Sequence, residues 1–145
     1  MAPATLPSRK TRKDFQRLAE LRAKEAATLS KTGNQQGAYY LAGFAVECAL
    51  KACIAKKPRR HDFPADKEYA AKVYTHNLDQ LLKLAHLDAQ LESDMKARPL
   101  LANNWDLVRG GKVDSRYETS KLGGRNMTLA VNSADGVLQW IKLHW

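Results

Sequence analysis

Residues 37–57, GAYYLAGFAVECALKACIAKK, are the stretch that decides the fold. Between residues 38 and 55 the only charged side chains are Glu47 and Lys51, and there is no proline. Because alanine and leucine favour helix, the stretch predicts one buried helix. On a helical wheel its large-residue face carries both charges, so each charge needs a partner or solvent. That face comprises Tyr40, Phe44, Glu47, Lys51 and Ile54, and the opposite side is lined by Ala38, Ala42, Ala45 and Ala49.

The length of this segment also suits a membrane span. Two ionisable side chains one turn apart within it oppose that interpretation, because such groups are rare in the middle of a span. The chain as a whole is hydrophilic, with a mean hydropathy of -0.51. We therefore expect a core helix of a soluble protein and no membrane partner.

The composition indicates one soluble globular domain with a basic surface. The chain has 145 residues, of which 44% are hydrophobic and 27% are charged, enough for a single domain with a real core. Its 24 Lys+Arg against 15 Asp+Glu give a formal net charge of +9. This excess favours polyanions such as RNA, DNA or nucleotides, although a basic protein that is merely soluble remains the alternative.

The two cysteines, Cys48 and Cys53, lie five residues apart on the same expected helix. They point to different sides of it, so they cannot pair with each other, and both read as small buried hydrophobic residues. Residues 1–13 hold two prolines and a basic cluster but no apolar segment of the signal-peptide type. We expect a disordered basic arm there, followed by one helical domain over residues 14–145, in a reducing cytoplasm.

The rest of the chain also follows helical periodicity. Apolar residues recur every three to four positions in several segments, and no segment alternates convincingly as a strand does. Asp14 is a candidate N-cap for the first helix, and Thr75 or Asn77 for a later one. Pro99 opens another turn, after which apolar residues continue at helical spacing to Gly110-Gly111, namely Leu100, Leu101, Trp105 and Val108. The prediction is an all-α, up-and-down bundle of about five helices, whose first two form an antiparallel hairpin. The main expected helices span residues 14–30, 37–57, 75–84, 88–97 and about 127–145.

The densest basic cluster follows the central helix, where residues 56–61 read KKPRRH. Cations suit a helix C-terminus, so a solvated helix end explains this cluster. Arginine and lysine also bind phosphate, which makes a phosphate-contacting loop the second interpretation. The candidate nucleic-acid or nucleotide ligands are Lys56, Lys57, Arg59, Arg60, His61 and, further along, Tyr117.

Residues 39–52, YYLAGFAVECALKA, resemble the second helix of HEPN domains, which are small helical-bundle proteins. The shared pattern is an aromatic residue, a small residue with glycine, a hydrophobic residue with glutamate, then Leu-Lys. The sequence Thr-His-Asn-Leu at residues 75–78 is similar to the His-x-Leu helix start of that family, and Arg116-Tyr117 is similar to its Arg-Tyr element. The resemblance covers residues 14–145.

The resemblance implies a divided set of functions. Many HEPN proteins are metal-independent RNases, often toxins of toxin–antitoxin pairs, and typically homodimers. Others bind nucleotides or accompany a small nucleotidyltransferase. The RNase signature of the family is an arginine followed, after four to six residues, by a histidine. This chain lacks it, because none of its histidines, His61, His76, His86 and His144, has an arginine five to seven positions earlier.

Metal-free RNA cleavage needs a base, an acid and a cation. His76 is the candidate base and Arg116 the candidate cation. The alternatives remain open: a histidine at a helix start often caps or packs, and Arg116 can pair with Glu47, which needs a cation beyond Lys51. No metal-ligand spacing and no glycine-rich phosphate loop is visible, so no cofactor is expected.

The sequence therefore predicts a HEPN-like protein that binds RNA or nucleotides, within a toxin–antitoxin or defence module. Metal-independent RNase activity stays open. The expected partners are a second copy of the chain and an antitoxin or nucleotidyltransferase. The alternative is a non-catalytic interaction subunit that pairs with a small nucleotidyltransferase.

Overall fold

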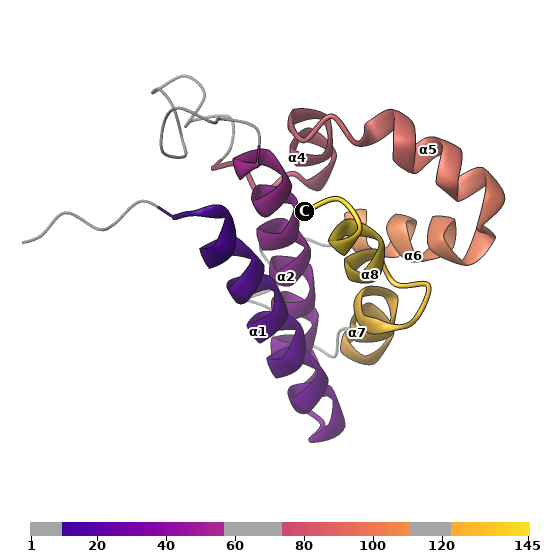
Figure 1. The fold of residues 1–145 in the computed structure, drawn as a ribbon. Coiled ribbons are helices and arrows are strands. Elements are labelled where there is room, and N and C mark those ends of the chain that lie inside the picture. The colour runs from indigo at the N-terminus through magenta and orange to yellow at the C-terminus, as the bar shows by residue number, and fades with distance from the viewer. Residues whose placement is uncertain (1–9, 57–73, 111–122) are drawn as a thin grey trace, which may run out of the picture.

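The computed structural model describes residues 10–56, 74–110 and 123–145, and all regular secondary structure in these residues is helical. The prediction of an all-α bundle is confirmed (Figure 1). The described residues form seven helices, where about five were expected. They are α1 (Arg12–Lys31), α2 (Gln35–Ala55), α4 (Leu78–Leu84), α5 (Asp88–Ala97), α6 (Pro99–Arg109), α7 (Gly124–Asn132) and α8 (Val137–Lys142).

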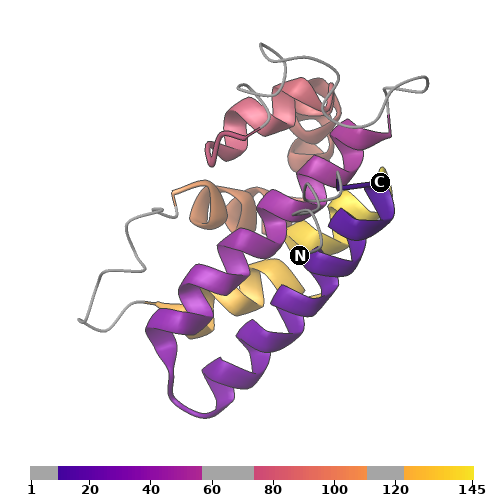
Figure 2. The same ribbon diagram turned by 90° about the vertical axis from the view of Figure 1, so that its left-hand side faces the viewer.

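Helices α1 and α2 form the expected antiparallel hairpin, which is the longest feature of the molecule (Figure 2). Gly33 turns the chain between them with a φ of 83°, a value that glycine adopts without steric cost. The two helices meet through small side chains. Their buried alanines, which let the backbones approach closely, are Ala19, Ala23 and Ala26 of α1 and Ala38, Ala42, Ala45, Ala49 and Ala52 of α2.

Helix α2 lies at the centre of the fold, because α1, α4, α7 and α8 all pack against it. Every residue from Ala45 to Ile54 is buried. The helix is long and apolar enough to cross a membrane, yet 67% of its most apolar window is buried inside the bundle. That burial is typical of the core helix of a soluble protein.

The expected C-terminal helix is two helices, α7 and α8, and this corrects the sequence prediction. The break falls at Ser-Ala-Asp-Gly, residues 133–136, a run of residues that favour turns. A Cβ on Gly136 would lie 2.5 Å from the carbonyl oxygen of Val131, so only glycine fits there. Helix α7 also begins at Gly124, earlier than expected. Here a Cβ would lie 2.2 Å from the carbonyl oxygen of Gln35, which shows how closely α7 approaches α2.

The start of α1 also differs from expectation, whereas the cap of α4 and the proline that opens α6 were among those expected. Thr11, not Asp14, is the N-cap of α1: its side chain accepts a hydrogen bond from the Asp14 amide, and the Asp14 carboxylate accepts one from the Thr11 amide. This reciprocal capping box satisfies two amide groups that a helix start otherwise leaves unpaired. Pro99 opens helix α6, which confirms the helical spacing expected from Leu100 to Val108. At α4, Asn77 is the cap among the two candidates, since its side chain accepts from the Gln80 amide.

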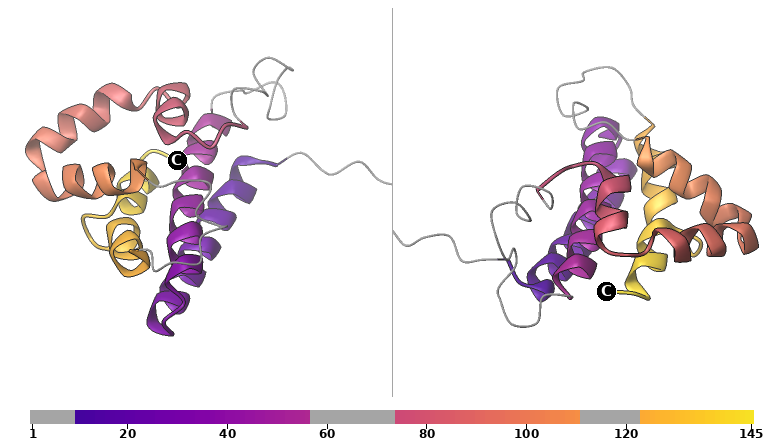
Figure 3. Two further views of the ribbon diagram at one scale, coloured as in Figure 1. Left: turned by 180° about the vertical axis from the view of Figure 1, so that it is seen from behind. Right: turned by 90° about the horizontal axis from the view of Figure 1, so that it is seen from above.

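Helices α5 and α6 form a limb on the side of the molecule away from α1 (Figure 3). Polar contacts tie this limb to the C-terminal helices. The indole N–H of Trp140 donates to the Asp94 carboxylate at 2.8 Å, and Arg98 lies 3.0 Å from Asp135. The hydrogen bond from Trp140 is the main reason why the pKa of Asp94 is lowered from its ordinary value.

This hydrogen bond predicts a pH-dependent contribution to stability. Because the folded chain lowers the pKa of Asp94, the contact stabilises the fold above the ordinary aspartate pKa, about 4, and is lost as pH falls through the lowered value. We expect Trp140→Phe to destabilise the chain more at pH 6 than at pH 2. Urea unfolding followed by circular dichroism measures the difference.

Trp105→Phe is the matched control, because Trp105 is buried to a similar degree on α6. Its destabilisation should stay constant between the two pH values. A Trp140→Phe effect that is equally constant would show that the Asp94 contact adds nothing to the pH dependence.

Candidate functional site

The two charges of α2 lie together inside the bundle. Glu47 is 6% exposed and Lys51 is 7% exposed, one helical turn apart. The Lys51 ammonium lies 3.1 Å from Oε2 of Glu47. Isolated charges are costly to bury, so this ion pair is what permits both residues to sit on the central helix.

A second partner reaches Glu47 from a distant part of the chain. Nδ1 of His76 lies 2.8 Å from Oε1 of Glu47. Each carboxylate oxygen of Glu47 therefore has its own partner, one on α2 and one just before α4. The His76 side chain is 53% exposed, so one end of the ring meets the buried carboxylate and much of the rest faces solvent.

The residues around His76 hold it against α2. Asn77 caps α4, and the Asn77 amide also donates to the Thr75 hydroxyl at 3.1 Å. The helix that follows is anchored in the core through Leu78, Leu81 and Leu82, which are buried. His76 is therefore fixed from both sides, by the capped helix start and by the carboxylate.

Tyr74 completes this cluster. The Lys51 ammonium lies 5.8 Å from the centre of the Tyr74 ring, within the range of a cation–π contact. The residue is 61% exposed. Sequence reasoning did not single out Tyr74, because nothing in its local pattern indicates that residue 51 lies beneath its ring. We refer to Glu47, Lys51, Tyr74 and His76 as the Glu47 cluster.

The Glu47–His76 contact determines how the imidazole can act. A carboxylate only accepts hydrogen bonds, so with Glu47 ionised the proton of neutral His76 resides on Nδ1. Nε2 is then left with a free lone pair, the arrangement in which histidine accepts a proton from another molecule. Carboxylate–imidazole pairs of this kind orient the base in many hydrolytic enzymes.

The cysteine next to Glu47 is not a competing nucleophile. Burial raises the pKa of the Cys48 thiol to about 12, and the neighbouring Glu47 carboxylate acts in the same direction. The thiolate is therefore scarce at neutral pH. Cys48 and Cys53 are both buried and form no disulfide, as the sequence indicated.

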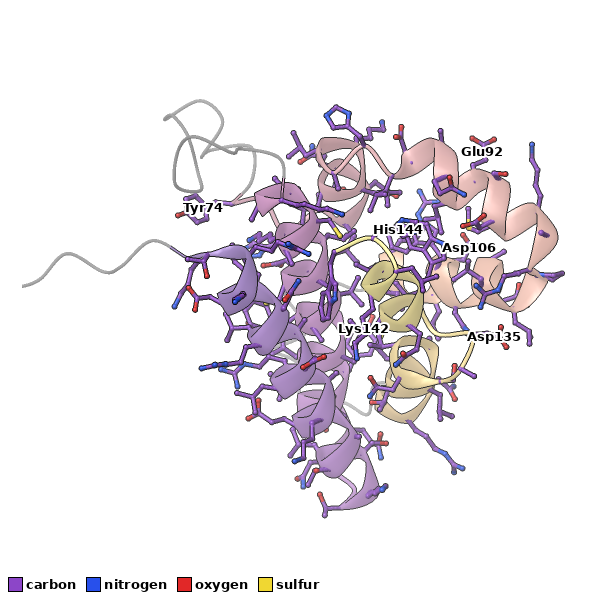
Figure 4. All side chains as sticks on the ribbon, viewed as in Figure 1. Tyr74, Glu92, Asp106, Asp135, Lys142 and His144 are labelled. Carbon is purple, nitrogen blue, oxygen red and sulfur yellow. The ribbon has the colours of Figure 1, made fainter. Side chains whose placement is uncertain are left out.

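Lys56 lies in a different place from the cluster. Together with Cys53, His86 and His144, it lines a cavity of about 520 Å³. None of the residues of the Glu47 cluster lines this cavity. Figure 4 shows Tyr74 and His144 on opposite sides of α2. The remaining predicted site residues lie outside the described residues, so the expected Arg116–Glu47 contact stays a prediction. They are Lys57, Arg59, Arg60, His61, Arg116 and Tyr117.

Among residues 10–56, 74–110 and 123–145, no group of three or more His, Cys, Asp or Glu side chains could hold a metal ion. Comparisons with protein-family models, with curated proteins and with solved structures found no match to this chain.

The burial of the Glu47–Lys51 ion pair predicts how substitutions of the two residues change the stability of the fold. Glu47→Gln leaves the Lys51 ammonium buried beside a neutral amide, which should cost about 3–5 kcal/mol of unfolding free energy. The double variant Glu47→Leu/Lys51→Met removes both charges and fills the space with apolar atoms. It should therefore be more stable than Glu47→Gln, as measured by urea unfolding.

The surface pair Arg98–Asp135 supplies the control, since both side chains are well exposed. Asp135→Asn should cost less than about 1 kcal/mol, because exposed ion pairs contribute little. If the double variant proves less stable than Glu47→Gln, the ion pair contributes net stability and the assumed desolvation cost is wrong.

Proposed function

We propose that this chain is a HEPN-like RNA-binding protein that cleaves RNA without a metal, with His76 as the base. The observation that carries the proposal is the contact between Glu47 and Nδ1 of His76 at 2.8 Å on a half-exposed ring. The resemblance of residues 39–52, 75–78 and 116–117 to HEPN sequences supports the HEPN-like and RNA-binding parts of the proposal. The base is proposed from the geometry alone, because the chain lacks the arginine–histidine RNase signature of that family. A homodimer in the cytoplasm, paired with an antitoxin or similar partner, belongs to the proposal too.

The chemistry would proceed through the 2′-hydroxyl of RNA. Nε2 of His76 takes the hydroxyl proton, and the 2′-oxygen forms a bond to the adjacent phosphorus. The bond from phosphorus to the 5′-oxygen breaks, that oxygen takes a proton from water, and a 2′,3′-cyclic phosphate remains. Glu47 holds the imidazole in the required tautomer and stabilises the imidazolium that forms. Arg116 is the proposed cation at the phosphorus.

The charge of the chain supports a polyanionic substrate. A formal net charge of +9 draws RNA toward the protein over distances comparable to the screening length. The basic cluster at residues 56–61 follows α2 directly in sequence, and it is a candidate for contacts to phosphates farther along the RNA, because Lys56 lines a cavity away from the Glu47 cluster.

The first test is an RNase assay of purified variants without added metal and with a chelator present. His76→Asn removes the base and should lower the cleavage rate at least about 100-fold, the usual contribution of a positioned base. Arg116→Ala and Glu47→Gln should also lower it, provided that the variants remain folded by circular dichroism. The measured quantity is the rate of 2′,3′-cyclic phosphate formation.

His86→Asn is the matched control for His76→Asn. His86 has a positive φ of 58°, which asparagine tolerates, so the change should leave the fold intact. It should also leave cleavage unchanged. Equal residual activity in every variant would instead indicate a contaminating nuclease and remove the enzymatic part of the proposal.

The second test measures RNA binding. The double variant Arg59→Glu/Arg60→Glu should weaken the affinity for single-stranded RNA and reduce the dependence of that affinity on salt, because fewer counterions are released. Fluorescence anisotropy at several salt concentrations gives both quantities.

The control Lys24→Glu/Lys31→Glu makes the same charge change on the exposed surface of α1. It should weaken binding less than the change at residues 59 and 60. If the unmodified chain does not bind RNA even at low salt, the RNA-binding proposal fails and the alternative, a non-catalytic interaction subunit, is favoured.

A further inference from the structure

The Glu47 cluster presents two exposed rings, Tyr74 and His76, from the short segment before α4. Among the described residues, Tyr74 is the only aromatic residue that belongs to the exposed large hydrophobic side chains. The aromatic residues of α6 and α8, Trp105 and Trp140, are buried in the core. Proteins that bind single-stranded nucleic acids combine positive charge with exposed aromatic side chains, and an exposed tyrosine in a strongly basic chain fits this combination.

Both rings are anchored by the same carboxylate. Glu47 contacts His76 directly, and it also contacts Lys51, whose ammonium lies against the Tyr74 ring. Glu47 and Lys51 are buried on α2, against which four other helices pack. The positions of the two rings therefore depend on close-packed core side chains, which have little room to rearrange. A ring that is already placed loses little conformational entropy when a ligand stacks on it.

The Lys51 ammonium lies over the Tyr74 ring without covering the residue. The residue remains 61% exposed, which leaves surface for a planar partner. Every nucleobase has a π-face that can stack on such a ring, whatever the sequence. A base inside a duplex is already stacked on both faces, so the partner that fits is an unpaired base.

We propose that Tyr74 forms a stacking site for one unpaired nucleobase, beside the ring of His76. This inference rests on the proposed RNA binding and adds the part of the substrate that the protein recognises, a single-stranded segment. Tyr74 is then a binding residue, and the sugar next to the stacked base carries the hydroxyl that meets His76. Electrostatic attraction between the basic protein and the RNA phosphates, which is independent of sequence, supplies the rest of the affinity for RNA.

The experiment is a fluorescence anisotropy titration with a labelled single-stranded 2′-O-methyl RNA, which has no free 2′-hydroxyl and so cannot be cleaved. A second probe of equal length carries the same sugar–phosphate backbone without bases. Four proteins are compared: the unmodified chain, Tyr74→Ala, Tyr74→Phe and Leu100→Ala. Leu100 is also 61% exposed, but lies on α6, so it controls for the loss of an exposed side chain.

We expect Tyr74→Ala to weaken binding of the base-containing probe about 5- to 150-fold, the range for loss of one stacked base. The dependence of the affinity on salt concentration should be the same for Tyr74→Ala and the unmodified chain, because stacking releases no counterions. Tyr74→Phe keeps the ring and Leu100→Ala leaves the site intact, so both should bind as the unmodified chain does. The probe without bases should bind the unmodified chain and Tyr74→Ala equally.

Two results would overturn the stacking site alone. One is salt-dependent binding of the base-containing probe with equal affinity for the unmodified chain and Tyr74→Ala. The other is an equal loss of affinity by Tyr74→Ala for both probes, which would mean that the tyrosine does not contact a base. If the unmodified chain binds neither probe at low salt, the proposed function itself fails, and the stacking site fails with it.

Discussion

A carboxylate buried on the central helix is the constraint on which this structure depends. Glu47 lies in a segment that is apolar almost throughout, and its desolvated charge would destabilise the fold without partners. One partner, Lys51, is supplied by the helix itself one turn later. The other, His76, comes from a segment 29 residues away, so the start of α4 must lie against α2 for the charge to be satisfied.

The surrounding helices keep this constraint in place through close packing. The alanine faces of α1 and α2 bring their backbones together, and Gly124 lets α7 lie directly against the start of α2. A helix packed on several sides in this way moves little. The functional consequence is that a half-exposed histidine and an exposed tyrosine lie against side chains of the buried central helix.

The same carboxylate connects stability with chemistry. A fully apolar helix could occupy the core without any ion pair, and such replacements are often neutral or stabilising in other proteins. Retaining Glu47 and Lys51 fixes the orientation of one imidazole and one phenol ring at the surface. This arrangement is the physical basis of both the proposed base and the proposed stacking site.

The amino-acid sequence by itself determined the helical class, the buried position of α2 and the separation of the two cysteines. These features depend on local periodicity and on residues close together in the chain, such as the apolar run around Glu47 and the capping side chain of Asn77. The helix over Asp88–Ala97 was predicted to the residue for the same reason. The sequence also indicated that the Glu47 carboxylate needed a partner in addition to Lys51, because burying a charge is costly in any fold.

Only the tertiary structure decided which side chains satisfied that need. The contact of His76 with Glu47 and of Tyr74 with Lys51 joins segments that are distant in sequence, and no spacing rule links residues so far apart. The break between α7 and α8 was also missed, although its signal is local: Ser133, Asp135 and Gly136 favour a turn, and Gly136 fits against the carbonyl of Val131. Local patterns fix which segments are helical and which faces are apolar, whereas the pairing of distant polar groups follows from how those helices pack.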